Sequence, residues 1–314
     1  MNIHSTYTSI LGIIITVLFF VPACTHRSSL IKKRVYRSSS EQIQPEECKQ
    51  IEPILTVWIH GTRFWLDALY KKAFNAQPGL KALHELPAHH KLTKRMKALA
   101  DQCADFFPYE TVYCFCWSGK LKSIEREEAA DILHESLFKL INDYQQKHGH
   151  KPAIRLVCHS HGANVALNLA RVNAQKEHHI TIDELILFAC PVQCETKNCA
   201  RNSMFKRIYS FYSPLDMVQI TAPQWVCRVC NADGVVVACK KQLLPLSDRR
   251  FDKAPNIRQA WIKRNGWALN HTDFSLHCFL RLLPELLEAM NDAYNEHEEL
   301  TTCKKQLLIR IEKS

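Results

Sequence analysis

The 314-residue sequence has no internal repeat, and its charged residues are mostly scattered. Lys and Arg (41) outnumber Asp and Glu (31), which gives a net charge of +10, but basic residues gather only at 32–37 and 240–250. This scatter favours a solvated basic surface over a nucleic-acid-binding groove. With 46% hydrophobic and 23% charged residues, the chain has the composition of a globular protein and can bury a large core.

The N-terminal region lacks an apolar run of full membrane-spanning length. Residues 9–24 form an uncharged apolar run of about fifteen residues, which is typical of the hydrophobic region of a signal peptide. The run ends in Val-Pro-Ala-Cys, which resembles a bacterial lipobox, so we expect lipidation of Cys24. A single-pass anchor is the alternative, because the first nine residues contain no Lys or Arg and several basic residues follow the run. In either case, segment 1–24 predicts a membrane-associated protein.

The 14 cysteines cannot all pair within the chain if Cys24 is lipidated, because 14 less one leaves an odd number. Those in apolar, strand-like runs are typical of small buried hydrophobic residues: Cys114, Cys116, Cys158 and Cys190. Those in polar stretches fit disulfides, structural zinc ligands or free thiols: Cys194, Cys199, Cys227, Cys230 and Cys239. The sequence leaves these three alternatives open.

Apolar strand-like runs alternate with amphipathic stretches from residue 53 onward. We expect strands within 53–61, 110–119, 153–158, 183–190, 205–212 and 257–266. We expect helices over 79–106, 123–146, 162–175 and 272–294, the last with a break at Pro284. This alternation predicts an α/β fold with a mostly parallel central sheet and helices on both faces.

One domain is expected over residues 51–298. A linker at 25–50 precedes it, and a polar C-terminal tail at 299–314 follows it. Asn231 to Gly234 read as a turn, which predicts a β-hairpin over 225–241 inside a Cys-rich insertion at about 220–255.

The stretch RLVCHSHGAN at 155–164 places a serine between a buried strand and a helix rich in small residues. On such a tight turn the hydroxyl of Ser160 would be exposed above the carboxyl end of the strand, as in the nucleophile elbow G-x-S-x-G. Gly162 satisfies the second small position of this motif, while Cys158 stands where the first glycine is usual. Ser160 is therefore the candidate nucleophile.

A second turn, in WIHGTR at 58–63, ends an earlier strand. A backbone N–H there can stabilise a developing oxyanion together with the N–H that follows the nucleophile. We expect Thr62 and His161 to supply these two donors. For the side chains of His60 and His161, a structural role in hydrogen-bonding the loops of the pocket is favoured over a catalytic one.

Two further residues complete a nucleophilic constellation. Asp216 follows the fifth strand in YSPLD, and His271 precedes the closing helix in NHTDF. The imidazole would take the serine proton, and the carboxylate would orient the imidazole and stabilise its charged form. Glu195, after the fourth strand, is the alternative acid, and His277 is the alternative base.

These segments resemble the α/β-hydrolase superfamily, on its lipase- and esterase-like side. The resemblance covers residues 55–297 and rests on IHGT, FCWSG, CHSHGA, YSPLD and NHTDF. It implies an α/β-hydrolase fold whose Cys-rich insertion lies between the acid and histidine segments. It also implies a Ser160–His271–Asp216 triad and cleavage of a carboxylic ester.

We expect no cofactor and no catalytic metal, because no Asp-x-His or Glu-x-x-His pattern accompanies the His-Ser-His sequence. The expected partners are an ester or lipid substrate and a membrane, with no nucleic-acid or protein partner. A thioesterase or acyltransferase would use the same triad. The alternative from another class is a non-catalytic membrane-associated binding or scaffold protein with a hydrolase fold, which Cys158 in the elbow favours.

Overall fold

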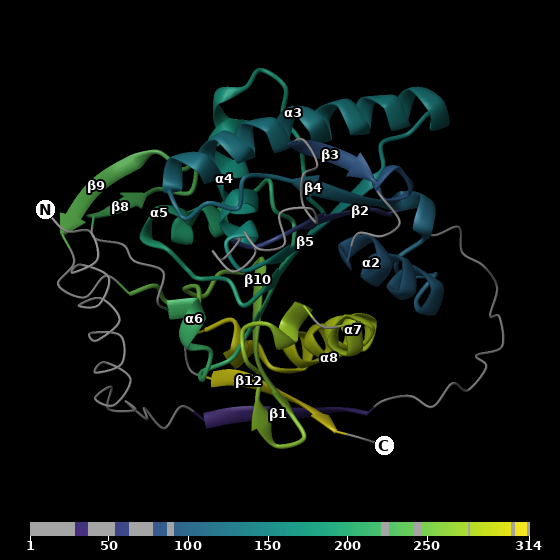
Figure 1. Ribbon diagram of the computed structural model, residues 1–314. Coiled ribbons are helices and arrows are strands. Elements are labelled where there is room, and N and C mark those ends of the chain that lie inside the picture. Colours follow the sequence, from purple (N-terminus) through teal and green to yellow (C-terminus); the bar gives the residue numbers. More distant parts are fainter. Residues whose placement is uncertain are drawn as a thin grey trace, which may run out of the picture.

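A ten-stranded sheet forms the centre of the protein in the computed structural model (Figure 1). The structure describes residues 29–36, 54–62, 78–86, 91–220, 226–241, 246–275, 277–302 and 305–312. The strands of this sheet are β1 (Ser29–Tyr36), β2 (Ile54–Ile59), β3 (Gly79–Ala82), β4 (Val112–Cys116), β5 (Ala153–His159), β6 (Glu184–Phe188), β7 (Ile208–Tyr212), β10 (Ile257–Arg264), β11 (Trp267–Ala268) and β12 (Lys305–Glu312).

The strand order is β1-β12-β10-β7-β6-β5-β2-β4-β3, and β11 pairs with β10. Neighbouring strands run parallel except in two pairs, β3 with β4 and β10 with β11. Parallel strands of this kind end at one common edge of the sheet, so loops that are distant in sequence meet there.

Helices cover both faces of the sheet (Figure 1). The helices α3 (Ser123–His148) and α4 (Gly162–Gln175) lie on one face, and α2 (Lys91–Gln102), α7 (His277–Leu280) and α8 (Leu283–Glu296) lie on the other. Successive strand residues point to opposite faces. In β5, Leu156 and Cys158 therefore pack in the core with α3 and α4, whereas Val157 packs in the core with α2 and α8.

This architecture confirms the predicted α/β class with a mostly parallel sheet and helices on both faces. Each of the six predicted strand ranges overlaps a strand, and the range 123–146 lies within α3. The closing helix is interrupted as expected, because α7 ends at Leu280 and Pro284 occupies the first turn of α8.

Both ends of the predicted domain differ from the sequence-based expectation. The linker at 25–50 contains β1, and the polar tail at 299–314 contains β12, which pairs with β1 along its whole length. Charged residues interrupt and flank the apolar run of β12, so its pattern resembles a polar tail. In the sheet the apolar side chains of this strand are buried: Leu307, Leu308, Ile309 and Ile311. The range 79–106, expected to be helical, begins with β3 and becomes α-helical only at Lys91.

The predicted hairpin is present as a separate two-stranded antiparallel sheet of β8 (Val226–Cys230) and β9 (Val236–Lys241). Its turn closes with a hydrogen bond from the Gly234 N–H to the Asn231 carbonyl, and Gly234 adopts a positive φ of 74°. The hairpin lies beside α5 (Cys194–Lys197), and the short helix α6 (Met217–Ile220) precedes it in the chain.

The cysteines expected in the core are buried. Of the polar-region cysteines, Cys194 is disulfide-bonded, whereas Cys199, Cys230 and Cys239 carry free thiols. The side chain of Cys227 lies outside the described residues, as do segment 1–24 and Cys24. No helix within the described ranges is both long and apolar enough to cross a membrane.

Candidate active site

Ser160 lies at a sharp turn between β5 and α4. Its φ of 54° is a left-handed conformation that side-chain-bearing residues rarely adopt. The Ser160 N–H donates to the Phe188 carbonyl at 2.9 Å, and the Ser160 carbonyl accepts the Ala163 N–H at 3.0 Å. These bonds tie the turn to β6 on one side and to α4 on the other. The turn therefore has the strained strand-to-helix geometry of a nucleophile elbow.

Two glycines allow the His60–Thr62 turn to pack directly against this elbow. A Cβ on Gly61 would lie 2.7 Å from the Ser160 Cβ, and a Cβ on Gly162 would lie 2.5 Å from the His60 carbonyl oxygen. Real Cβ atoms do not approach other atoms so closely, so only glycine fits both positions. Gly61 therefore packs directly against the candidate nucleophile, and Thr62 is the next residue in the chain.

Asp216 and His271 form a buried hydrogen-bonded pair. The Nδ1 of His271 lies 2.8 Å from Oδ2 of Asp216, and their side chains are 7% and 0% exposed. The other carboxylate oxygen, Oδ1, accepts the Gln219 N–H at 3.0 Å. Because the carboxylate has no proton to donate, Nδ1 of His271 carries the proton. The other nitrogen, Nε2, is then the unprotonated, basic one.

Nε2 of His271 is buried and has no hydrogen-bond partner among the described residues. His271 also lies against His159, the residue before Ser160. Nε2 of His159 contacts the His271 carbonyl oxygen at 3.0 Å, and the His159 and His271 rings lie 4.9 Å apart. The His159 contact links the elbow to the His271 loop, and no local sequence pattern indicates it.

The alternative acid, Glu195, has other partners. Its Oε1 lies 2.9 Å from Arg126, and its Oε2 lies 3.0 Å from Arg228. These ion pairs direct the carboxylate toward α3 and β8, whereas Asp216 faces His271. The alternative base, His277, begins α7, and its side chain lies outside the described residues.

The two histidines near the turns have structural contacts, as expected. Nε2 of His60 accepts the Trp117 N–H at 3.4 Å, and the Trp117 indole N–H donates to the His60 carbonyl at 2.8 Å. Burial, together with the positive charge of Arg126, lowers the pKa of His161 to about 3, so its side chain is neutral. The backbone N–H of His161 stands at the start of α4, where the first amides of a helix have no partner within the helix.

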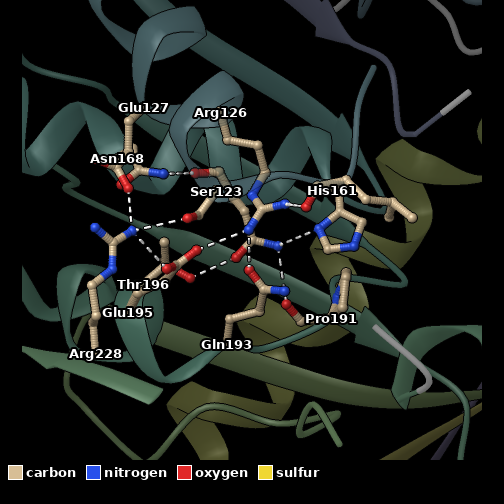
Figure 2. A network of polar contacts seen from close by, with 12 residues as sticks. Ser123, Arg126, Glu127, His161, Asn168, Pro191, Gln193, Glu195, Thr196 and Arg228 are labelled. Carbon is tan, nitrogen blue, oxygen red and sulfur yellow. Dashed lines mark hydrogen bonds and ion pairs between the residues drawn. The ribbon is translucent and has the colours of Figure 1, made fainter. Parts of the chain in front are cut away.

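A polar network connects the hairpin with the elbow (Figure 2). Arg228 of β8 pairs with Glu127 of α3 and with Glu195 of α5, and Glu195 also binds the buried Arg126. The next residue along α5, Thr196, donates to Asn164 of α4, whose side-chain amide lies 3.3 Å from Nδ1 of His161. The network therefore anchors the insertion to the helix that begins at the elbow.

The carboxyl ends of three parallel strands thus carry the candidate residues. Ser160 follows β5, Asp216 follows β7, and His271 follows β10 and β11. The elbow after a central strand and the chain order of these residues are those of the α/β-hydrolase fold. The chain has this fold.

No protein-family model matches the sequence, and no curated protein matches it. The chain is similar to a solved gene product of Listeria innocua, at 11% identity and a TM-score of 0.33, over 82% of this chain and 98% of that one. It is also similar to carboxyl esterase 2 of the mycorrhizal fungus Tuber melanosporum, at 8% identity and a TM-score of 0.32, over 84% and 69% of the two chains. A bacterial heroin esterase matches at 9% identity and a TM-score of 0.28, over 85% and 67%. These TM-scores are too low to indicate a function for this chain.

Proposed function

We propose that this protein is a serine hydrolase that cleaves carboxylic esters through an acyl-enzyme at Ser160. The observation that carries the proposal is the state of His271. Asp216 lies at hydrogen-bond distance from Nδ1 of His271, while Nε2 of the same ring is buried without a hydrogen-bond partner among the described residues, beside the elbow that presents Ser160. A buried basic nitrogen without a partner is costly unless it serves a reaction, and a neighbouring serine hydroxyl is the proton donor it would need.

In the proposed reaction, Nε2 of His271 takes the Ser160 proton as Oγ attacks the ester carbonyl carbon. The carbonyl oxygen becomes an oxyanion, which the N–H groups of Thr62 and His161 stabilise. The carbon–oxygen ester bond then breaks, and the alcohol leaves with the proton from His271. Water attacks the acyl-enzyme by the same route, which releases the carboxylic acid and restores Ser160. Asp216 stabilises the imidazolium in both halves.

We also propose that the protein works at a membrane surface, on esters that include lipids. The apolar run at 9–24, Cys24 and the net charge of +10 support this part of the proposal. Mass spectrometry of the mature N-terminus from membrane fractions tests it. A lipidated Cys24, or an uncleaved segment 1–24 in the membrane fraction, agrees with the proposal, and recovery of the protein only from the soluble fraction contradicts it.

Labelling with a fluorophosphonate probe tests the catalytic proposal. The probe phosphonylates an activated serine, so we expect the wild type to be labelled and folded Ser160→Ala to be unlabelled. Ser136→Ala, a change at a partly exposed position of α3, is the matched control and should keep the label. Absence of label on folded wild type would instead favour a non-catalytic binding protein. A panel of oxygen esters and thioesters then separates an esterase from a thioesterase with the same triad.

A further inference from the structure

We propose that His134, Glu135 and His178 form a binding site for a divalent transition-metal ion, and that Zn²⁺ suits it best. His134 and Glu135 lie on α3, and His178 lies in the loop after α4. One potential ligand atom of each residue lies within 4.8 Å of those of the other two. Two imidazoles and one carboxylate form a set of ligands that zinc accepts in proteins, with water completing the tetrahedron.

The hydrogen bonds around His134 determine which of its ring nitrogens can bind a metal. Oδ1 of Asn173 accepts the Ile180 N–H at 2.8 Å, so this atom is the amide oxygen. The same oxygen lies 3.1 Å from Nε2 of His134, which must therefore carry the proton and donate it. Nδ1 of His134 is left with a free lone pair. Metal-binding histidines commonly donate their second N–H to an oxygen in this way.

Two nitrogens of the cluster are buried without a hydrogen-bond partner in the described part of the chain. They are Nδ1 of His134 and Nε2 of His178. His134 itself is 0% exposed. An unsatisfied acceptor in the interior weakens folding, and a bound cation would remove this cost.

Glu135 and His178 are also oriented for a shared ligand. The His178 ring packs against Phe138, with 3.9 Å between the ring centroids. Glu135 binds Lys176 through Oε1 at 2.5 Å. Its Oε2 lies 3.7 Å from Nε2 of His178, too far for a hydrogen bond but near the spacing of two ligands on one ion.

The cluster is remote from the candidate active site. Asn173, which supports His134, lies on α4 eleven residues after Gly162, which corresponds to about 16 Å along the helix axis. A metal here would join α3 to the loop between α4 and β6, so it would stabilise the fold and take no part in ester cleavage. The inference does not depend on the proposed function.

Zinc titration of protein purified without a histidine tag and stripped with EDTA tests the site. We expect one Zn²⁺ per chain and a rise in melting temperature of about 5 °C at a free concentration near one hundred times Kd. His178→Gln and Glu135→Gln should each abolish this rise. His179→Gln is the matched control, because His179 is an exposed neighbour in the same loop whose ring contacts the Asn173 carbonyl. This variant should retain the full response.

Cobalt spectroscopy distinguishes the cluster from the cysteines, since the exposed Cys239 carries a free thiol. Co²⁺ held by nitrogen and oxygen gives weak visible bands, whereas thiolate ligands add a strong near-ultraviolet charge-transfer band. That strong band would overturn the proposal, as would equal zinc affinity in the wild type and His178→Gln. If the cluster is only an ion pair between protonated His178 and Glu135, no zinc will bind at micromolar concentrations, which would also refute it.

Discussion

Replacing Asp216 with Asn removes one negative charge from the buried pair and leaves its shape nearly unchanged. Oδ1 of Asp216 accepts the Gln219 N–H, so the amide oxygen of the new side chain would keep this bond. Its NH₂ group would then face Nδ1 of His271, where Oδ2 now lies at 2.8 Å. Since an NH₂ group only donates, Nδ1 must become the acceptor, and the imidazole proton moves to Nε2. His271 could no longer take the proton of Ser160.

The size of this effect follows from the burial of the pair. With side-chain exposures of 7% and 0%, water cannot replace the lost carboxylate. In serine hydrolases an imidazole held in the wrong tautomer lowers kcat about 10⁴-fold, which corresponds to about 5.5 kcal/mol in the activation barrier. We therefore expect Asp216→Asn to lower the turnover of a chromogenic ester by about this factor, with an unchanged circular dichroism spectrum.

Glu195→Gln is the matched comparison, because it neutralises the alternative carboxylate. Glu195 pairs with Arg126 and Arg228, so its loss should weaken the fold and change kcat less than about tenfold. If Asp216→Asn stays within about tenfold of the wild type while Glu195→Gln loses activity about 10⁴-fold, the proposed role of Asp216 is refuted.

Three further predictions concern the surroundings of the site. Gly162→Ala would push a Cβ to within 2.5 Å of the His60 carbonyl oxygen, so we expect a loss of about 1–3 kcal/mol in urea unfolding and reduced labelling of Ser160. His161 stays neutral when buried but gains a proton on unfolding below its ordinary pKa. The unfolding free energy should therefore fall as the pH drops from about 6.5 toward 3, by up to about 1.4 kcal/mol per pH unit, and His161→Gln should remove this part of the slope. Arg228→Met breaks the ion pairs that hold the hairpin, so limited proteolysis should cleave 226–241 faster than in the wild type, with little change at α8.

The local parts of the site could be predicted from sequence because they depend on neighbouring residues. A buried strand, one serine and a helix of small residues already define the turn at Ser160. Asp216 and His271 lie 55 positions apart in the chain. Their order in the sequence identifies them as candidates, but only the fold brings them into contact. The same limit applies to the cluster of His134, Glu135 and His178, which combines one helix with a distant loop and has no local motif.

A strand at or next to the sheet edge can carry charged side chains, and its sequence then resembles a polar, unstructured segment. In β12, Lys305, Arg310 and Glu312 surround an apolar run, and the whole resembles a solvated tail. Only the pairing with β1 and β10 gives this run a buried face. The ion pairs of Glu195 could not be predicted from the sequence either, because Arg126 and Arg228 belong to elements that contact Glu195 only in the folded chain.

Cys158 is the one departure from the elbow motif, and its surroundings explain why the turn tolerates it. The side chain is fully buried in the apolar cluster that includes Ala163 and Ala166 of α4, whose small size leaves room for a thiol. The closest backbone approaches fall instead at Gly61 and Gly162, where no Cβ fits. Burial raises the pKa of Cys158 well above its usual value, so the thiol is protonated and a poor nucleophile. Ser160 reaches the elbow conformation with cysteine at this position, so Cys158 is no structural reason to expect an inactive protein.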